Sequence, residues 1–225
     1  FGIADYAWNI NGFKSDEAWK EGIVRLYPQA AEAMQAFVDH NSDQGPNGHG
    51  YRREESVNIA PVVTRVLEAA REGRVVKSDT ALLKKEFSRM AAAAPVIREK
   101  VDNPRLMKEI GAWVDAFEQL GMAGQHAVAA LENSSPKAAV TALVKATQAL
   151  AAMDRISREH NQQGQLYRSA VKTGSRVMTP AVNELADIVS RKTFPSLSGT
   201  PALSPRPLVK GGSLDKAELF CDGDR

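Results

Sequence analysis

The stretch NPRLMKEIGAWVDAFEQLGMAGQHAVAAL, residues 103–131, decides the fold of this chain. Asn103 followed by Pro104 predicts the start of a helix, because Asn caps free backbone N–H groups and Pro fits the first turn. Alternating spacings of four and three then place a narrow apolar stripe along the helix, which favours nearly antiparallel packing against other helices. The stripe consists of Leu106, Ile110, Trp113, Phe117, Leu120, Gly124, Ala127 and Leu131.

Helical patterns continue on both sides of this stretch. On the N-terminal side, Gly73 is predicted to stop one helix and Ser78 to cap the next. On the C-terminal side, Ser135 and Pro136 repeat the start signal, and Pro180 is predicted to lie in the early turns of a last helix, about 174–191, or to kink it. The positions predicted to face inward are Ile59, Val62, Val63, Val66, Ala70, Leu83, Phe87, Met90, Ala94, Leu143, Ala146, Leu150, Met153, Met178, Ala181, Leu185 and Ile188.

The N-terminal part predicts a strand followed by two helices. FGIADYAWN, residues 1–9, alternates and is rich in aromatic residues, as in a buried β-strand. Ser15 is the predicted N-cap of the first helix, and Pro28 separates it from the second. The apolar positions predicted to face inward from these two helices are Trp19, Ile23, Leu26, Met34 and Phe37.

Short connections make neighbouring helices antiparallel, so the chain is predicted to be all-α, an up-and-down antiparallel helical bundle preceded by the strand. Residues 193–212 are rich in Pro, Ser and Gly and predict a linker. The final stretch SLDKAELFCDGDR predicts the start of a further module. The first residue is Phe1 rather than Met, which predicts that the chain is cut from a longer one.

Composition and charge limit the classes of function. The chain has 225 residues, 43% hydrophobic and 25% charged, with a net charge of +2, as in ordinary globular proteins. This balance gives no reason to expect a nucleic acid as partner, and no apolar run reaches the ~20 residues that span a bilayer. Cys221 is the single cysteine, which excludes an internal disulfide and a Cys-rich zinc site.

The only dense polar cluster is the segment HNSDQGPNGHGYRREES, residues 40–56, which its Gly and Pro residues predict to be a loop. Three interpretations stay open. His40, Asp43 and His49 could form a metal site, although their spacing matches no familiar ligand pattern. Alternatively, hydrogen bonds made by Asp43, Asn47 and the run Arg52, Arg53, Glu54 and Glu55 could tie the loop down and cap the next helix.

The third interpretation is that the loop presents His49 to a ligand held by a neighbouring domain. Glycines on both sides of His49 let the backbone approach such a ligand closely. Elsewhere the chain contains no phosphate-binding Gly-rich loop, His-Glu-x-x-His or Gly-x-Ser-x-Gly, so the sequence predicts no catalytic residue, metal or cofactor.

GIADYAWN, the Trp-containing helix that ends in LYP, and HNSDQGPNGHGYRREES together resemble glycoside hydrolase family 84, the bacterial β-N-acetylglucosaminidases, also called O-GlcNAcases or hyaluronidases. The resemblance is specific over residues 1–60 and looser to Arg191. It implies that residues 1–14 are the remnant of the last strand of a catalytic TIM barrel. Residues 15–56 would then form the boundary between barrel and bundle, 57–192 the post-catalytic bundle, and 193–225 the linker and the start of a module.

The resemblance also implies a mechanism. Family members retain configuration by using the 2-acetamido group of the sugar as the nucleophile, assisted by an adjacent Asp-Asp pair, an exception to the two-carboxylate scheme. That pair is absent from this sequence, so this fragment alone is expected to be inactive. His49, with Asn47 and Asp43, would lie near the substrate at the rim of the pocket.

The partners that the resemblance implies are the TIM barrel of the same polypeptide, a substrate containing N-acetylglucosamine and, as in some family members, a second copy in a homodimer. The expected location is secreted or periplasmic. The competing hypothesis is a freestanding helical bundle that acts as a protein-interaction module with no catalytic role.

Overall fold

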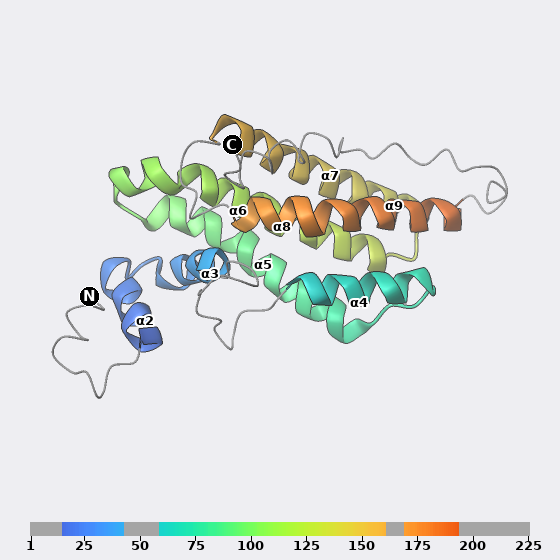
Figure 1. Cartoon of the computed structure of the whole chain (residues 1–225), viewed down its shortest axis with the longest axis horizontal. Helices are drawn as coiled ribbons and strands as arrows, with labels where there is room; N and C mark the ends of the chain where they lie inside the picture. The colour runs from blue at the N-terminus through green and yellow to red at the C-terminus, as the bar shows by residue number, and fades with distance from the viewer. Residues whose placement is uncertain (1–14, 43–58, 161–168, 194–225) are drawn as a thin grey trace, which may run out of the picture.

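The computed structural model describes residues 15–42, 59–160 and 169–193, and these residues are almost entirely helical (Figure 1). The predicted all-α class is therefore confirmed. The predicted strand at residues 1–9 and the linker after residue 193 lie outside the described part. No helix within the described ranges is long and apolar enough to cross a membrane.

Three long consecutive helices form one side of the bundle: α5 (Lys77–Lys100), α6 (Pro104–Glu132) and α7 (Pro136–Glu159). Ion pairs show that α5 and α6 run antiparallel. Lys84 near the start of α5 reaches Glu132 at the end of α6 over 3.4 Å, whereas Arg98 near the end of α5 reaches Asp115 over 2.6 Å. The prediction of an up-and-down bundle is borne out in these helices.

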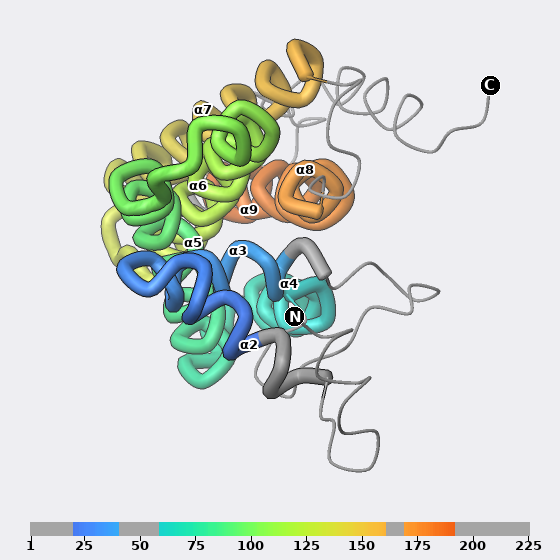
Figure 2. Tube along the Cα trace, turned by 90° about the vertical axis from the view of Figure 1, so that its left-hand side faces the viewer, coloured from blue at the N-terminus to red at the C-terminus, as the bar shows by residue number. Residues whose placement is uncertain are grey.

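The other side of the bundle holds α4 (Ile59–Arg71) and a continuous helical rod made of α8 (Ser169–Thr173), η2 (Gly174–Met178) and α9 (Thr179–Thr193). Seen along the long axis, α5, α6 and α7 follow one another on one side, and α4, α8 and α9 face them (Figure 2). Two layers of helices therefore enclose the core between them.

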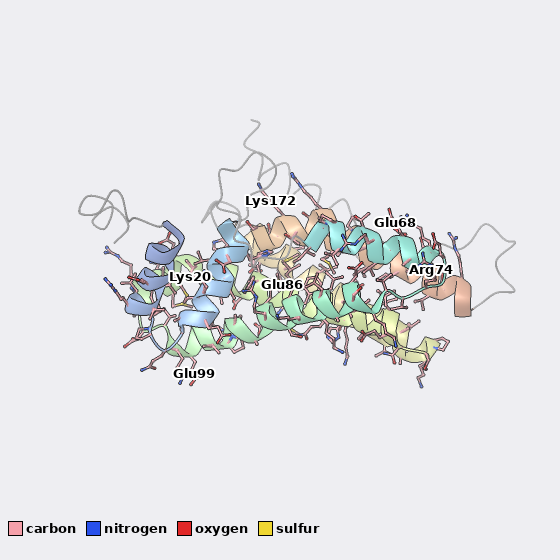
Figure 3. The ribbon with its side chains drawn as sticks, turned by 90° about the horizontal axis from the view of Figure 1, so that it is seen from below. Lys20, Glu68, Arg74, Glu86, Glu99 and Lys172 are labelled. Atoms are coloured by element: carbon pink, nitrogen blue, oxygen red, sulfur yellow. The ribbon has the colours of Figure 1, made fainter. Side chains whose placement is uncertain are left out.

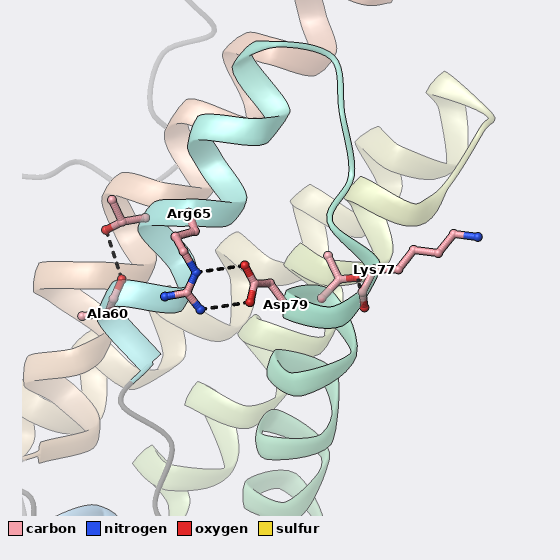
Figure 4. A network of polar contacts seen from close by, with 6 residues as sticks. Ala60, Arg65, Lys77 and Asp79 are labelled. Atoms are coloured by element: carbon pink, nitrogen blue, oxygen red, sulfur yellow. Dashed lines mark hydrogen bonds and ion pairs between the residues drawn. The ribbon is translucent and has the colours of Figure 1, made fainter.

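Two bidentate ion pairs hold α4 in place. Arg65 donates to both carboxylate oxygens of Asp79 on α5, over 3.0 and 2.9 Å (Figure 4). Six residues further on, Arg71 donates in the same way to Glu184 on α9, over 2.6 and 3.1 Å. Because each pair joins α4 to a different helix, α4 is fixed against both sides of the bundle.

The stripe on α6 forms the centre of the core, as the sequence predicts. Trp113 is 1% exposed, and Phe117, Leu120 and Ala123 are fully buried. The predicted inward positions of the helices after residue 58 are buried, except Leu106, Leu131 and Ile188, which pack on the core half-buried. Burying a large apolar side chain contributes about 1.5–3 kcal/mol, so this stripe supplies a major part of the stability.

The two N-terminal helices differ in how they meet the bundle. Phe37 of α3 (Ala31–Ser42) is 1% exposed and packs edge-on against Phe117, with ring centroids 5.5 Å apart. By contrast, α2 (Ser15–Leu26) packs mainly on α3. The prediction that Leu26 faces inward is wrong, because its side chain is 56% exposed. Leu26 is the last residue of α2.

Helix starts were predicted with mixed success. Asn103 caps α6 as predicted, since its side chain accepts a hydrogen bond of 3.0 Å from the Leu106 backbone N–H. The prediction of Ser78 as N-cap is wrong: α5 begins at Lys77, and its N-cap is Val76. Ser135 occupies the N-cap position of α7 as predicted, but its side chain makes no capping hydrogen bond.

This difference gives a matched pair of variants. Asn103→Ala is expected to lower the free energy of unfolding by about 1 kcal/mol, because it leaves a backbone N–H of α6 without its cap. Ser135→Ala is expected to leave stability nearly unchanged, because no capping bond is lost. Urea unfolding followed by circular dichroism measures both. Equal losses in the two variants would contradict the assignment of these caps.

Pro180 is the second residue of α9 and follows a π-helical turn. In that turn the Thr179 N–H donates to the Gly174 carbonyl, one residue further back than in an α-helix. Pro180 has no N–H for the carbonyl four residues before it, and its ring would crowd that carbonyl. The wider turn relieves this conflict, so the rod continues through the proline.

Candidate functional site

The predicted site lies between α3, which ends at Ser42, and α4, which begins at Ile59. All residues predicted to contact a substrate or to anchor the loop fall outside the described part, so their roles stay predictions. The structure does describe the two helices that hold this segment, and the corner of the bundle against which α3 ends (Figure 1). The residues outside are Asp43, Asn47, His49, Arg52, Arg53 and Glu54.

His40, one of the three residues considered as a possible metal site, lies in the last turn of α3 and packs into this corner. Its ring centroid is 5.4 Å from that of Phe117. One edge of the residue reaches the surface, but Nε2 is enclosed and has no hydrogen-bond partner among the described residues. The imidazole also forms a hydrogen bond with the backbone of Ser169, the first residue of α8. His40 therefore joins α3 to α6 and α8.

The surroundings of His40 keep its imidazole neutral. Burial, as the larger cause, and the nearby positive charge of Arg89 together lower the pKa of His40 to about 4, against the opposing effect of the Ser169 hydrogen bond. Among the described residues, no three His, Cys, Asp or Glu side chains are grouped closely enough to hold a metal ion. The structure thus gives His40 a role in packing at this corner.

Arg89 belongs to a partly buried ion pair on α5. It donates to Glu86 over 2.5 Å, one turn back along the helix, and Glu86 is only 7% exposed. Figure 3 shows Glu86 near the middle of the molecule, far from either end of the bundle. A carboxylate in such a place needs a cationic partner, because an unpaired buried charge costs several kcal/mol.

The sequence analysis did not single out Glu86 or Arg89. A signal existed, because Glu86 lies beside Leu83, Phe87 and Met90 on the apolar face of α5. A carboxylate at such a position indicates a buried pair. Together with His40, the pair forms a polar corner, defined here as His40, Glu86 and Arg89. Its chemistry suits the fixing of helices relative to one another, since a neutral imidazole and a paired carboxylate lie inside a packed core.

The fold and this corner define the class of protein: a helical bundle in which the described polar side chains hold the helices in position. Comparison with known families then places the chain. Residues 55–186 match the family described as "Bacterial GH84, post-catalytic domain", which is more than half of the chain. The chain belongs to this family, so it is a helical domain of a glycoside hydrolase.

A solved structure described as "Structure of CpGH84D" has a similar fold. The alignment covers 84% of this chain at 24% sequence identity with a TM-score of 0.51. It covers only 32% of the other chain, so this chain spans about a third of that protein's length. The likeness supports the helical fold and carries no information on substrate.

Proposed function

We propose that this chain is the post-catalytic domain of a retaining, substrate-assisted β-N-acetylglucosaminidase of the O-GlcNAcase type. It packs on the catalytic barrel of the same polypeptide and supports the rim of the active site with the segment that carries His49. The family match over residues 55–186 supports this proposal, as does the resemblance of the first 60 residues to family 84.

The observation that carries the proposal is how firmly both ends of that segment are held. Before it, Phe37 and His40 pack against Phe117 in the core. After it, Ile59 is 5% exposed, and Arg65 and its ion pair fix α4 on α5. Functional loops work best on rigid supports, because a supported loop loses less conformational entropy when it binds.

A second observation supports contact with another domain. Val24 and Leu26 on α2 are 55% and 56% exposed, and α2 directly follows the residues that resemble the last barrel strand. Exposed apolar side chains at such a place suit an interface. The freestanding interaction module would use this surface equally well, but it gives no role to the strand or to the glycine-flanked His49.

In the proposed enzyme the reacting groups come from elsewhere. The substrate's 2-acetamido oxygen attacks the anomeric carbon while the glycosidic C–O bond breaks and the leaving oxygen takes up a proton from a general acid of the barrel. An upstream Asp-Asp pair orients and deprotonates the amide, and water then opens the oxazoline to release the sugar. His49 contributes by donating or accepting a hydrogen bond at the sugar's edge. The proposal extends to secretion or export to the periplasm and to a homodimer.

The proposal is tested in the intact enzyme with an aryl N-acetylglucosaminide. His49→Ala is expected to raise KM roughly tenfold with little change in kcat, since losing one hydrogen bond to the sugar costs about 1.4 kcal/mol of binding. His126→Ala, a half-buried histidine on α6, is the matched control and should keep both constants. Unchanged kinetics in His49→Ala would remove His49 from the site, and turnover by the isolated chain would contradict the assignment of catalysis to the barrel.

A further inference from the structure

Helix α7 presents an open face to solvent. It lies at the edge of the layer made by α5, α6 and α7 (Figure 2), and it packs on α6 and, across the core, on α9. Two apolar side chains on its outer side stay uncovered, since Val140 is 46% exposed and Val144 is 38% exposed. Together with their exposed neighbours at helical spacing they form what we call the α7 outer face: Lys137, Val140, Thr141, Val144 and Lys145.

The charge on this face is positive and is not balanced nearby. No Asp or Glu occurs in residues 133–153, although the chain contains 27 acidic residues. Lys137 and Lys145 form no ion pair with any described residue, whereas Arg158 on the same helix is paired with Asp154. The two lysines lie about 12 Å apart along the helix, at ~1.5 Å per residue. The face therefore has an apolar centre with one cation at each end.

A shallow groove borders this face on the side of α6. His126 of α6 forms one wall, and Lys137, Thr141 and Lys145 line the other. The pKa of His126 is lowered by burial and, to a smaller degree, by the positive charge of Lys145. The ammonium group of Lys145 therefore lies close to the imidazole. A ligand that brought a negative charge into the groove would offset the unfavourable potential at this place.

We propose that the α7 outer face binds an acidic amphipathic helix of a partner protein. The aliphatic side chains of the partner helix cover Val140 and Val144. Carboxylates on the same side of the partner helix, about two turns apart, pair with Lys137 and Lys145.

Three features favour a polypeptide over other anions. Helix α7 contains no aromatic residue, so it offers no platform on which bases stack. Two lysines are too few for a nucleic acid or an anionic membrane, because binding to either depends on many basic side chains. An acidic polysaccharide has no aliphatic side chain with which to cover the valines. A helix does, and its ridges of residues three and four apart fit the grooves between those of α7.

A synthetic peptide tests the proposal with the 225-residue chain. The probe is an amphipathic helix of about 20 residues, since shorter helices are marginal in water. It carries two glutamates eight residues apart with leucines between them, and a control peptide has lysines in place of these glutamates. The acidic peptide is expected to bind with a Kd of roughly 0.1–1 mM, because the interface is small, and to shift the NMR resonances of Val140 and Val144. The control peptide is expected to leave them unchanged.

Charge reversal then tests the two lysines. The double variant Lys137→Glu with Lys145→Glu is expected to weaken binding of the acidic peptide about tenfold, because two exposed ion pairs are replaced by like charges. Lys85→Glu with Lys108→Glu is the matched control, since these lysines of α5 and α6 are also exposed. This control variant is expected to keep the affinity, and circular dichroism verifies that both variants are folded.

His126 gives an independent measurement. Binding of the acidic peptide is expected to raise the pKa of His126, because the added carboxylate offsets the charge of Lys145. The proposal would be overturned by equal binding of the two peptides, by no saturable binding at millimolar concentration, or by equal affinities of the two double variants. Tighter binding of an oligothymidylate of similar length would also overturn it, because the surface would then belong to a nucleic acid.

Discussion

Gly121→Ala is expected to lower the free energy of unfolding by about 3 kcal/mol, at the upper end of the range for overpacked cores. A Cβ at this position of α6 would lie 2.5 Å from the Ala91 backbone nitrogen and 2.7 Å from the Phe87 carbonyl oxygen of α5. Backbone atoms inside a helix cannot move alone, so α5 and α6 would have to separate. Urea unfolding measures the loss.

The same helix offers the control. Gly111 is half-buried, and a Cβ there would meet nothing nearer than Met107 Cε at 4.0 Å. Gly111→Ala is therefore expected to stabilise the chain by up to about 1 kcal/mol, since alanine is the better helix former. Stabilisation by both substitutions would show that α5 and α6 do not approach as closely as described.

Gly124 tests the same close approach of α5 and α6, but here the added Cβ would meet a side chain rather than backbone atoms. Its Cβ would lie 2.1 Å from the ring of Phe87, which is fully buried. Gly124→Ala is expected to destabilise, and Phe87→Leu in the same chain is expected to recover part of that loss, because a smaller side chain makes room. Strictly additive losses would argue against direct contact between the two positions.

The second large effect is the dependence of stability on pH through His40. In the folded chain its pKa lies at about 4, against the ordinary value of 6.5 that applies after unfolding. Between these values the unfolded chain binds a proton that the folded chain does not, so unfolding becomes more favourable as the pH falls. The contribution is fully present above pH 6.5, is lost from there down to pH 4, and amounts to about 3 kcal/mol.

The contribution of His40 is isolated by comparing how steeply the free energy of unfolding changes with pH in the parent chain and in variants. In His40→Gln the free energy of unfolding should fall less steeply between pH 7 and pH 4.5 than in the parent chain, whatever the packing change costs at neutral pH. His126 is only half-buried, and its pKa is lowered by burial and by Lys145, so His126→Gln should remove a smaller part of the slope. An unchanged slope in His40→Gln would show that His40 is open to solvent.

The sequence predicted the candidate site less fully than the fold. The loop that carries His49 was chosen for its glycines and its polar residues, which are local features, and it lies outside the described residues. His40 was considered as a possible metal ligand among three open interpretations of the loop, and the structure places it against Phe117, which lies far away in the chain. The sequence alone could not identify Glu86 and Arg89 as an ion pair inside the bundle, because their burial depends on where α3 packs.

What the sequence determined by itself was the set of helices after residue 58, the buried stripe of α6 and the cap at Asn103. These follow from the 3.6-residue period and from hydrogen bonds between near neighbours, which need no partner elsewhere. Only the tertiary structure decided that Leu26 stays exposed, that Gly121 touches the backbone of α5 and that His40 stays uncharged. Each of these depends on which distant segment lies opposite, because burial and close contact are properties of two packed surfaces.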